Sequence, residues 1–284
     1  MRNYPLKTDI SHYPLAKESP QTISLIGAGA LGTNLLAALA KKGFNIGQVL
    51  SRNPDSSDAL VAEMRKGRRI LTPKEREPDN DFVFITVGDR VLDDVVREVI
   101  AYRSPHTTYL HCSGSAAMNV LAPLGDKVGV LYPMQAFSRE RRIPFTDIPI
   151  FVEGTPEVQP RVRILAHALS RSVKWLDSNE RRRLHIGAVF AANFTNYMVR
   201  CAGEVVEGIP GVDYRTYMPL IREVIDRLET LNPTEAQTGP ARRADQQVIL
   251  AHFEYLRKKD VRLAFVYELV SRYIMESYKE NETP

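Results

Sequence analysis

The sequence contains little cysteine and no long apolar run. Two cysteines, Cys112 and Cys201, occur among 284 residues and lie far apart. They form neither a disulfide framework nor the paired spacing of a zinc site, so we expect no metal and a reducing, cytoplasmic location. No apolar stretch approaches the ~20 residues that a membrane-spanning helix requires. Residues 1–22 lack the apolar core of a signal peptide and are expected to form an irregular leader, which indicates a soluble protein without a membrane partner.

A strong excess of one charge is also absent. The formal net charge is +4, and 25% of the residues are charged and 44% hydrophobic, as in an ordinary globular protein. Two basic clusters, RKGRR at 65–69 and RERRI at 139–143, have no interleaved aromatic residues. A solvated basic surface is the favoured interpretation, and a nucleic-acid patch is the alternative. We therefore expect no nucleic-acid partner.

From residue 23 onward, short apolar runs alternate with helical patterns. Strands that alternate with helices of ten or more residues predict βαβ units and a parallel sheet. After Asp177 the strand patterns stop and helical patterns follow. The expected fold is α/β, with a Rossmann-type, mostly parallel sheet over residues 23–177 and an all-helical C-terminal domain over residues 178–284. The expected strands are ISLIGAG, GQVLS, RRILT, DFVFITVG, TTYLHCSG, VGVLYP, IPIFVEG and VKWLD.

Acidic residues stand where three of the helices are expected to begin. Asp89 is the expected N-cap of the helix after the fourth strand. Asp177 and Glu180 have capping-box spacing at the start of a long helix that extends to about residue 207. Asp245 is placed to cap the first of two helices near the C-terminus. The polar loop TGPARRAD, which Asp245 ends, either caps that helix or carries function.

The segment GAGALG predicts a dinucleotide-binding turn. It fits G-x-G-x-x-G, follows a predicted strand and opens a helix. Gly27 is expected to make the tight turn, Gly29 to let the backbone approach a pyrophosphate, and Gly32 to let the helix lie close to the strand. The helix N-terminus would present free N–H groups to the phosphates. The expected cofactor-binding residues here are Gly27, Ala28, Gly29, Ala30, Leu31 and Gly32, with Val87 and Gly88 at the end of the fourth strand.

The second strand does not end on an acid. NAD enzymes of this fold use an Asp or Glu there to bind the ribose hydroxyls, but no acid occurs between Gly32 and Asp55. Ser51, Arg52 and Asn53 stand at that strand end instead. Arginine pairs with a 2′-phosphate through a planar fork of donors, so the pattern favours NADP(H) over NAD(H). The alternative is that Arg52 only stacks on the adenine ring.

The ends of the fifth and sixth strands carry the candidate reaction site. Ligands of open α/β sheets lie outside the carboxyl ends of the strands, where HCSGS and YPMQAFS stand in this sequence. Ser113, Ser115 and Gln135 could hydrogen-bond a substrate carbonyl or carboxylate. His111 is either a general acid or a partner of local backbone groups, and both readings stay open. Cys112 is read as a packing residue.

The long helix after Asp177 contributes two further candidates. His185 and Asn193 lie on one helical stripe and could face a cleft between the domains. The alternative is a helix crossing with two satisfied polar residues.

Taken together, these segments resemble a known family. LIGAGALG, the SR after the second strand, HCSGS, YPMQAFS, FVEG, LHIGAVFAANF and TGPARRAD are similar to bacterial proteins with a Rossmann-like domain and a helical domain of unknown function, provisionally named NADP oxidoreductases. That family is similar in architecture to pyrroline-5-carboxylate reductase, ketopantoate reductase and 6-phosphogluconate dehydrogenase. The resemblance implies a homodimer formed through the helical domain and a cleft over the nicotinamide. Related hydroxyacid dehydrogenases carry a Lys in the corresponding helix, whereas this chain has no lysine between Lys174 and Lys258, so His185 takes that role or no residue does.

The sequence therefore predicts an NADP(H)-dependent oxidoreductase that transfers hydride to a small C=O or C=N substrate. His185 with Asn193 would donate or relay the proton. The alternative is a nucleotide-binding sensor or scaffold without turnover. A weaker hypothesis uses a deazaflavin as the second substrate.

Overall fold

The computed structural model describes residues 21–64, 67–70, 72–75 and 80–279. The predicted leader, residues 1–22, lies outside these ranges except for its last two positions. The first two residues of the basic cluster 65–69 also lie outside them.

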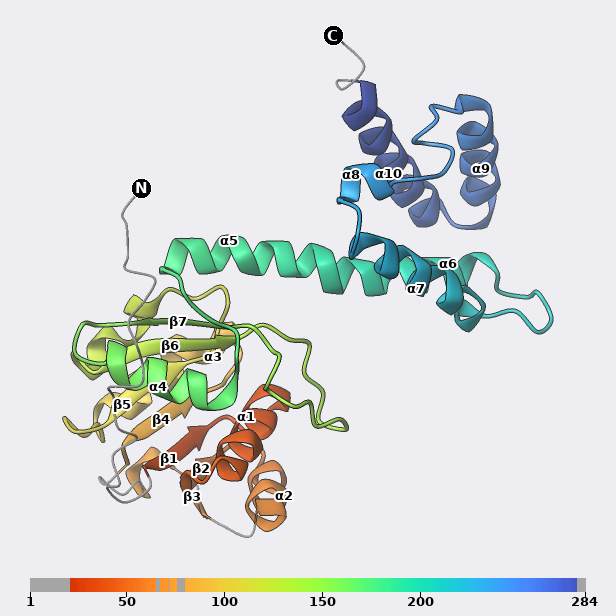
Figure 1. The fold of residues 1–284 in the computed structure, drawn as a ribbon. Coiled ribbons are helices and arrows are strands. Elements are labelled where there is room, and N and C mark those ends of the chain that lie inside the picture. Colours follow the sequence, from red (N-terminus) through yellow and green to blue (C-terminus); the bar gives the residue numbers. More distant parts are fainter. Residues whose placement is uncertain (1–20, 65–66, 71, 76–79, 280–284) are drawn as a thin grey trace. The chain divides into compact units, whose positions relative to one another are not determined.

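Eight strands form one sheet within the described residues (Figure 1). Their order is β3-β2-β1-β4-β5-β6-β7-β8. Neighbours from β3 to β6 pair in parallel, β7 pairs antiparallel with β6, and β8 runs parallel to β7. Each predicted strand run overlaps one of these strands, and the sheet is mostly parallel and of the Rossmann type, as predicted. The strands are β1 (Thr22–Ile26), β2 (Asn45–Leu50), β3 (Arg68–Ile70), β4 (Phe82–Ile85), β5 (Thr108–His111), β6 (Val128–Pro133), β7 (Ile150–Gly154) and β8 (Val173–Trp175).

Helices cover both faces of the sheet. In β4, Phe82 and Phe84 belong to one apolar cluster, whereas Val83 and Ile85 belong to another. The first cluster includes residues of α1, α2 and α4, and the second includes residues of α3 and η3. A strand covered on both faces must be apolar at successive positions, which explains the run FVFI. The helices of the two clusters are α1 (Ala30–Lys41), α2 (Pro54–Met64), α3 (Asp89–Ile100), η3 (Met118–Leu124) and α4 (Gln159–Leu169). A further short helix, η2 (Pro73–Glu75), follows β3.

The helix ends follow the predicted caps in two of three cases. Asp177 accepts hydrogen bonds from the N–H groups of Asn179 and Glu180 and forms the expected capping box at the start of α5 (Ser178–Ala188). Asp245 accepts a hydrogen bond from the N–H of Val248 and caps α9 (Gln246–Lys259). The prediction for Asp89 was wrong. The N-cap of α3 is Gly88, and Asp89 is already helical, so its carboxylate lies in the first turn, where it stabilises the helix dipole instead.

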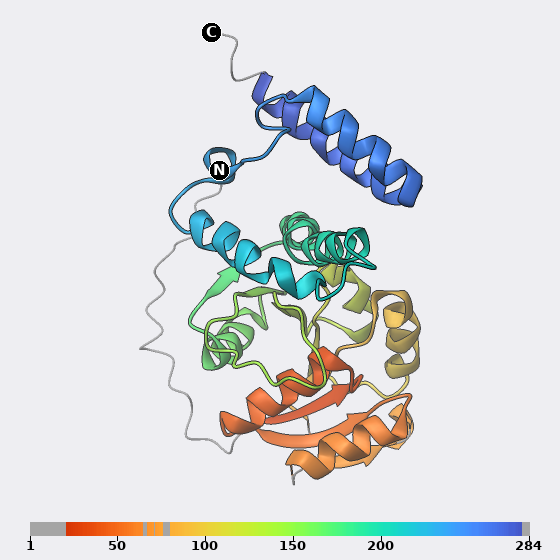
Figure 2. The same cartoon turned by 90° about the vertical axis from the view of Figure 1, so that its right-hand side faces the viewer.

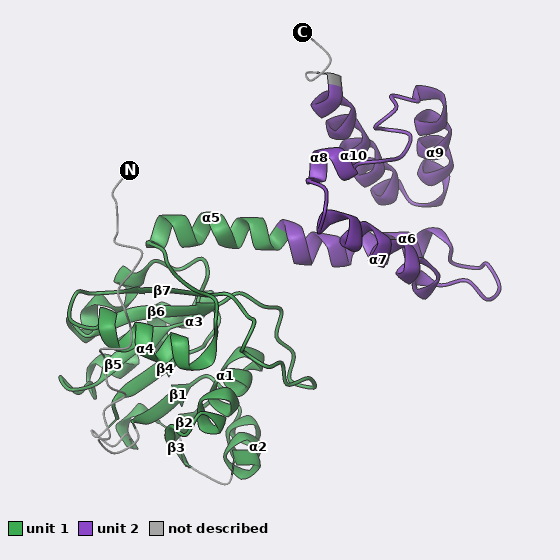
Figure 3. Cartoon of the chain, in the orientation of Figure 1, with its two compact units in different colours: residues 1–189 green, residues 190–284 purple. Residues whose placement is uncertain are grey.

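The chain divides into two compact units, residues 1–189 and 190–284 (Figure 3). The predicted domain boundary near residue 177 lies at the N-cap of α5, while the units meet inside the helical stretch that follows. That stretch is helical through residue 205 but contains a π-helical segment, η4 (Val189–Phe194), which its apolar pattern did not predict.

The second unit consists of helices within its described residues, as expected. Its last two long helices, α9 and α10, lie side by side (Figure 2). A small core of Cys201, Leu256, Leu263 and Ala264 joins them to α6. The helices after η4 are α6 (Thr195–Val205), η5 (Tyr214–Tyr217), α7 (Met218–Leu228), α8 (Pro233–Ala236), α9 and α10 (Val261–Lys279). Among the described residues, none of the helices has the length and apolarity that crossing a membrane requires.

Candidate functional site

The glycine turn between β1 and α1 has the geometry that its motif predicts. Gly27 has a φ of +106°, which a residue with a side chain rarely adopts. A Cβ built on Gly29 would meet no described atom within 4 Å, so this face of the turn is open to a ligand. A Cβ on Gly32 would lie 2.3 Å from the carbonyl oxygen of Gly27, which confirms that the helix packs closely on the turn.

Thr86, just beyond the end of β4, holds the glycine turn in place. Its hydroxyl donates to the carbonyl of Gly27 at 2.6 Å, and its N–H donates to the carbonyl of Ile26 at 2.8 Å. From the other side, the N–H of Gly27 donates to the carbonyl of Leu50 at the end of β2. The turn is therefore tied to both neighbouring strands. The first turn of α1 contains no acidic residue, so its free N–H groups can attract an anion.

The end of β2 presents cationic and neutral donors. Arg52 and Asn53 are exposed. The side-chain oxygen of Asn53 accepts a hydrogen bond from the N–H of Asp55 at 3.0 Å. This bond caps α2 and leaves the amide NH₂ of Asn53 available as a donor.

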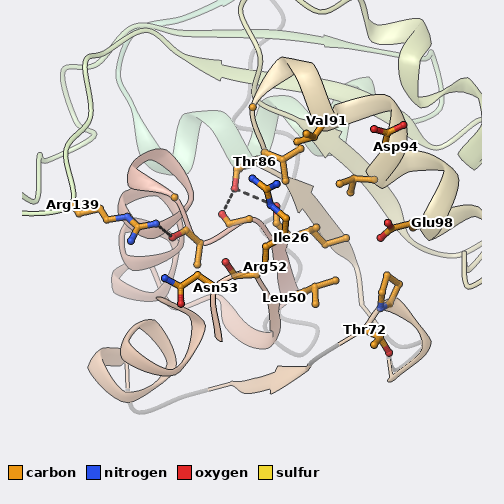
Figure 4. A pocket seen from close by; sticks show the side chains of 18 residues that line it. Ile26, Leu50, Arg52, Asn53, Thr72, Thr86, Val91, Asp94, Glu98 and Arg139 are labelled. Carbon is orange, nitrogen blue, oxygen red and sulfur yellow. Dashed lines mark hydrogen bonds between the residues drawn. The ribbon is translucent and has the colours of Figure 1, made fainter. Parts of the chain in front are cut away.

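A cavity of about 590 Å³ lies between the glycine turn, the end of β2 and the start of α3 (Figure 4). This volume lies within the range of cofactor sites. The predicted residues that line it are Gly27, Ala28, Gly29, Ser51, Arg52, Asn53, Val87 and Gly88. Ala30, Leu31 and Gly32 do not line it, because they form the first turn of α1 behind Gly29.

The cavity also contains residues that the motif did not indicate. Thr72, Asp94, Glu98 and Arg139 contribute to its wall. Arg139 belongs to the basic cluster RERRI, which the sequence favoured as a solvated surface. It reaches the cavity from the loop between β6 and β7. Because this loop is far from the glycine motif in the sequence, no local sequence pattern indicated that Arg139 would line the cavity.

A second group of residues gathers at the loop after β5. The hydroxyl oxygen of Ser113 accepts hydrogen bonds from the N–H groups of Ser115 and Ala116, at 3.0 and 2.8 Å. The buried guanidinium of Arg181, on α5, donates to the carbonyl of Ser113 at 3.2 Å and to that of Ala116 at 2.5 Å. Arg181 also forms an ion pair with Glu153 of β7. The loop that carries Ser113 and Ser115 is thus held by a buried charge.

His185 lies against this loop. Its Nδ1 is 3.0 Å from the hydroxyl of Tyr132, near the end of β6. A Cβ built on Gly114 would come within 2.6 Å of the same nitrogen, so only a glycine allows the imidazole ring to lie there. The sequence indicated His185 but not Tyr132 or Gly114, although both stand in the motifs YPMQAFS and HCSGS.

Two neighbouring residues, His111 and Cys112, are buried. His111 is fully buried, and its Nδ1 accepts a hydrogen bond from the N–H of Ser113 at 3.1 Å. Burial and the positive charge of Arg181 lower the pKa of His111 to about 3. The histidine is therefore neutral near pH 7 and binds local backbone, which favours the second of the two open readings. Burial raises the pKa of Cys112, in keeping with a packing role.

The other two predicted residues lie in more exposed places. Gln135 is exposed, and its side-chain oxygen accepts a hydrogen bond from the N–H of Ala136 at 2.8 Å. Asn193 is an exposed residue of the π-helical segment η4 in the second unit. Short π-helical segments are frequent at functional sites, so the position of Asn193 keeps it a candidate.

Comparison with protein families gives two matches. Residues 22–113 match a family described as NADP oxidoreductase, coenzyme F420-dependent. Residues 148–274 match a domain of unknown function, DUF2520. Comparison with curated protein sequences finds no match.

Solved structures extend this likeness over most of the chain. An imine reductase from Myxococcus stipitatus in complex with NADP+ has 16% identity and a TM-score of 0.66, and covers 91% of this chain and 94% of its own. A reductive aminase from Aspergillus terreus in complex with NADPH and ethyl levulinate has 18% identity and a TM-score of 0.67, and covers 91% and 95%. At these identities the two structures support the fold alone.

A third solved structure is more similar. A provisionally assigned NADP oxidoreductase from Bacteroides fragilis shares 35% identity at a TM-score of 0.83, and covers 90% of this chain and 98% of its own. The chain therefore belongs to the family of NADP oxidoreductases that join a Rossmann-like nucleotide domain to the helical domain of unknown function.

Proposed function

We propose that the protein is an NADP(H)-dependent reductase of a small C=O or C=N compound. The observation that carries this proposal is the cavity at the glycine turn, where the end of β2 supplies Ser51, Arg52 and Asn53 and no acid. The open face of Gly29 and the acid-free first turn of α1 suit a pyrophosphate. The guanidinium of Arg52 suits the 2′-phosphate that distinguishes NADP(H) from NAD(H).

The proton would come from His185 with help from Tyr132. Bound NADPH supplies the hydride to the substrate carbon. Burial raises the pKa of Tyr132, although the charge of Arg181 partly opposes this effect. The protonated hydroxyl of Tyr132 can thus donate to Nδ1 of His185, which leaves the ring proton on Nε2. As Nε2 gives its proton to the substrate heteroatom, the proton of Tyr132 passes to Nδ1, and solvent later restores the hydroxyl.

The substrate would lie beside the loop after β5. The O–H of Ser113 remains a donor, because its two hydrogen bonds use only the oxygen as acceptor. Ser115 and Gln135 add polar groups at the same edge of the sheet, and Asn193, on the π-helical segment η4, stays a candidate. The imine reductase and the reductive aminase support a C=N or C=O substrate by the names that they carry.

A homodimer formed through the helical unit is the second part of this proposal. Helix α7 has an apolar stripe, yet none of its residues is buried. Exposed apolar patches of this kind mark association surfaces, and we assign this one to a second copy of the chain in the cytoplasm. Sedimentation should show a dimer that Val224→Glu disrupts and Arg222→Glu, on the polar face, preserves; a monomeric wild type would contradict it. The exposed residues of the stripe are Leu220, Val224, Ile225 and Leu228.

The first experiment is a titration of the protein with NADPH and with NADH, followed by ligand fluorescence and repeated with Arg52→Ala. A preference for NADPH of tenfold or more, lost in the variant, would correspond to ~1.4 kcal/mol or more at the phosphate. NADPH consumption with a panel of small ketones, aldehydes and cyclic imines then tests turnover. Binding without turnover of any compound would favour the sensor or scaffold, and binding of neither nucleotide would reject the oxidoreductase.

A further inference from the structure

Arg139 lies between the two loops that would hold the phosphates of a dinucleotide. One end of its guanidinium donates to the carbonyl of Ala28 in the glycine turn, at 3.0 Å. The other end donates to the hydroxyl of Ser56 in the first turn of α2, at 3.1 Å. Ser56 follows Arg52 and Asn53 by only a few residues. Arg139 therefore joins the pyrophosphate side of the cavity to the ribose side.

The fold fixes the loop that carries Arg139. The buried side chain of Asn34, on α1, donates to the carbonyl of Ser138 at 2.9 Å and accepts from the N–H of Ile143 at 3.2 Å. Arg142 forms an ion pair with Glu63 of α2 at 2.5 Å. These contacts grip the loop on both sides of Arg139. The position of Arg139 at the cavity therefore depends on the fixed backbone of this loop as well as on the length of the arginine side chain.

The charge of Arg139 is compensated less directly than that of Arg142: its exposed neighbour Glu140, whose pKa is lowered mainly by hydrogen bonds and partly by the charge of Arg139, forms no ion pair with it among the described residues. Both groups that accept the hydrogen bonds of Arg139 are neutral, a carbonyl and a hydroxyl. Within the described residues, no carboxylate forms an ion pair with it. The acids of the cavity, Asp94 and Glu98, lie on the opposite side of the view (Figure 4), and Asp94 pairs with Arg97 at 3.2 Å. An arginine held at a cavity wall by neutral acceptors is suited to an anionic ligand.

We propose that Arg139 is a second specificity-determining arginine for the 2′-phosphate of NADP(H), acting opposite Arg52. This inference rests on the proposed function, because it concerns the same nucleotide. On binding, the guanidinium exchanges the hydroxyl of Ser56 for phosphate oxygens and keeps the carbonyl of Ala28. The 2′-phosphate is then held by one arginine from the end of β2 and one from the β6–β7 loop. NAD(H), which lacks this phosphate, gains nothing from Arg139.

The test compares Arg139→Ala with Arg141→Ala in the full-length protein. Arg141 is exposed on the same loop but is not part of the cavity wall, so its variant removes the same charge without removing the contact. We expect Arg139→Ala to raise the Kd for NADPH tenfold or more and to change the Kd for NADH less than twofold. Arg141→Ala should bind both nucleotides like the wild type. Arg139→Lys, which keeps the charge but loses the fork, should fall between wild type and Arg139→Ala.

Other results separate this inference from the proposed function. Equal weakening of NADPH and NADH by Arg139→Ala would overturn it and assign Arg139 to the pyrophosphate or to the structure of the turn. An unchanged Kd for NADPH, or the same loss in Arg141→Ala, would also overturn it while leaving the proposed function intact. A wild type that binds neither nucleotide, or binds both equally, would overturn the two proposals together. Preserved NADH binding is the internal check that the variant is folded.

Discussion

Nδ1 of His185 lies 3.0 Å from the hydroxyl of Tyr132, and the two rings meet edge to face with an interplanar angle of 75°. The contact joins α5 to the end of β6, which are distant in the sequence. A hydrogen bond to one ring nitrogen decides which nitrogen carries the proton. Under the proposed function, Tyr132 would therefore control which ring nitrogen of His185 can give a proton to a substrate.

We expect Tyr132→Phe to lower turnover by at least about tenfold, which is less than the ~10²–10⁴-fold that complete loss of general acid–base catalysis costs, because His185 itself remains. The phenyl ring keeps the packing but removes the hydroxyl that sets the tautomer of His185. The Kd for NADPH should stay unchanged. Steady-state kinetics with nucleotide titration provide the measurement.

The double variant tests whether the pair acts as a unit. If it does, Tyr132→Phe with His185→Ala should be no slower than His185→Ala alone. Additive losses would show that the two residues act separately.

Gly114→Ala should reproduce the loss of turnover of His185→Ala. The new methyl group would lie 2.6 Å from Nδ1 of His185, so the imidazole must leave its place. Such overpacking costs ~1–3 kcal/mol of stability. Gly187→Ala, on the same helix as His185, is the matched control, because its Cβ would meet no described atom within 4 Å. Equal activity of the two glycine variants would refute the role of the close contact.

Arg181→Met should destabilise the protein by about 3–5 kcal/mol, because the variant leaves the carboxylate of Glu153 buried without its partner. The Arg181 side chain is 1% exposed and that of Glu153 is 12% exposed. Urea denaturation measures the change. Arg182→Met, at the next and exposed position, should change stability by less than about 0.5 kcal/mol. A small effect of Arg181→Met would mean that the pair does not hold the loop.

Stability should fall as the pH decreases below about 6.5, in part because of His111. Its pKa is about 3 in the folded protein and 6.5 in a model peptide. Between these two pH values His111 is protonated in the unfolded chain and neutral in the folded protein. The contribution of neutral His111 to the free energy of unfolding is complete above pH 6.5 and is lost as the pH falls from 6.5 to 3. The slope is up to ~1.4 kcal/mol per pH unit.

Urea denaturation between about pH 7 and pH 5 would show this slope. The dependence of stability on pH should become weaker in His111→Asn, which keeps an acceptor for the N–H of Ser113. His106→Asn, at an exposed histidine, should keep the wild-type slope. The same slope in all three proteins would exclude His111 as the source.

The features that depend on residues close together in the sequence could be predicted from it. Strand runs such as FVFI and the glycine motif depend on burial and backbone angles of neighbouring residues, so their patterns are readable along the chain. The same holds for Asp177, whose capping partners are two and three residues away. The error at Asp89 was a shift of one residue at a helix end, where Gly88 is the N-cap and no side chain caps the helix.

The remaining features depend on contacts between distant residues. Arg181 stands in NERRRL, a run typical of a solvated helix face, and its partner Glu153 lies on strand β7. Arg139 lies at the cavity on a loop that is held by Asn34 of α1 and by the ion pair of Arg142 with Glu63 of α2. The contact of Tyr132 with His185 joins the end of β6 to α5, two elements that are more than 40 residues apart in the sequence. No sequence pattern within a single segment predicts these long-range contacts.

The buried arginine that holds the loop after β5 has a consequence for the redesign of this protein. Arg181 binds the loop through the main-chain oxygens of Ser113 and Ala116, which every amino acid possesses. The support is therefore indifferent to the side chain at position 115, and Gln135 is exposed on a neighbouring loop. We expect substitutions at these two positions to leave the contacts of Arg181 intact, so they are the first positions at which a library would test whether the proposed site sets substrate preference.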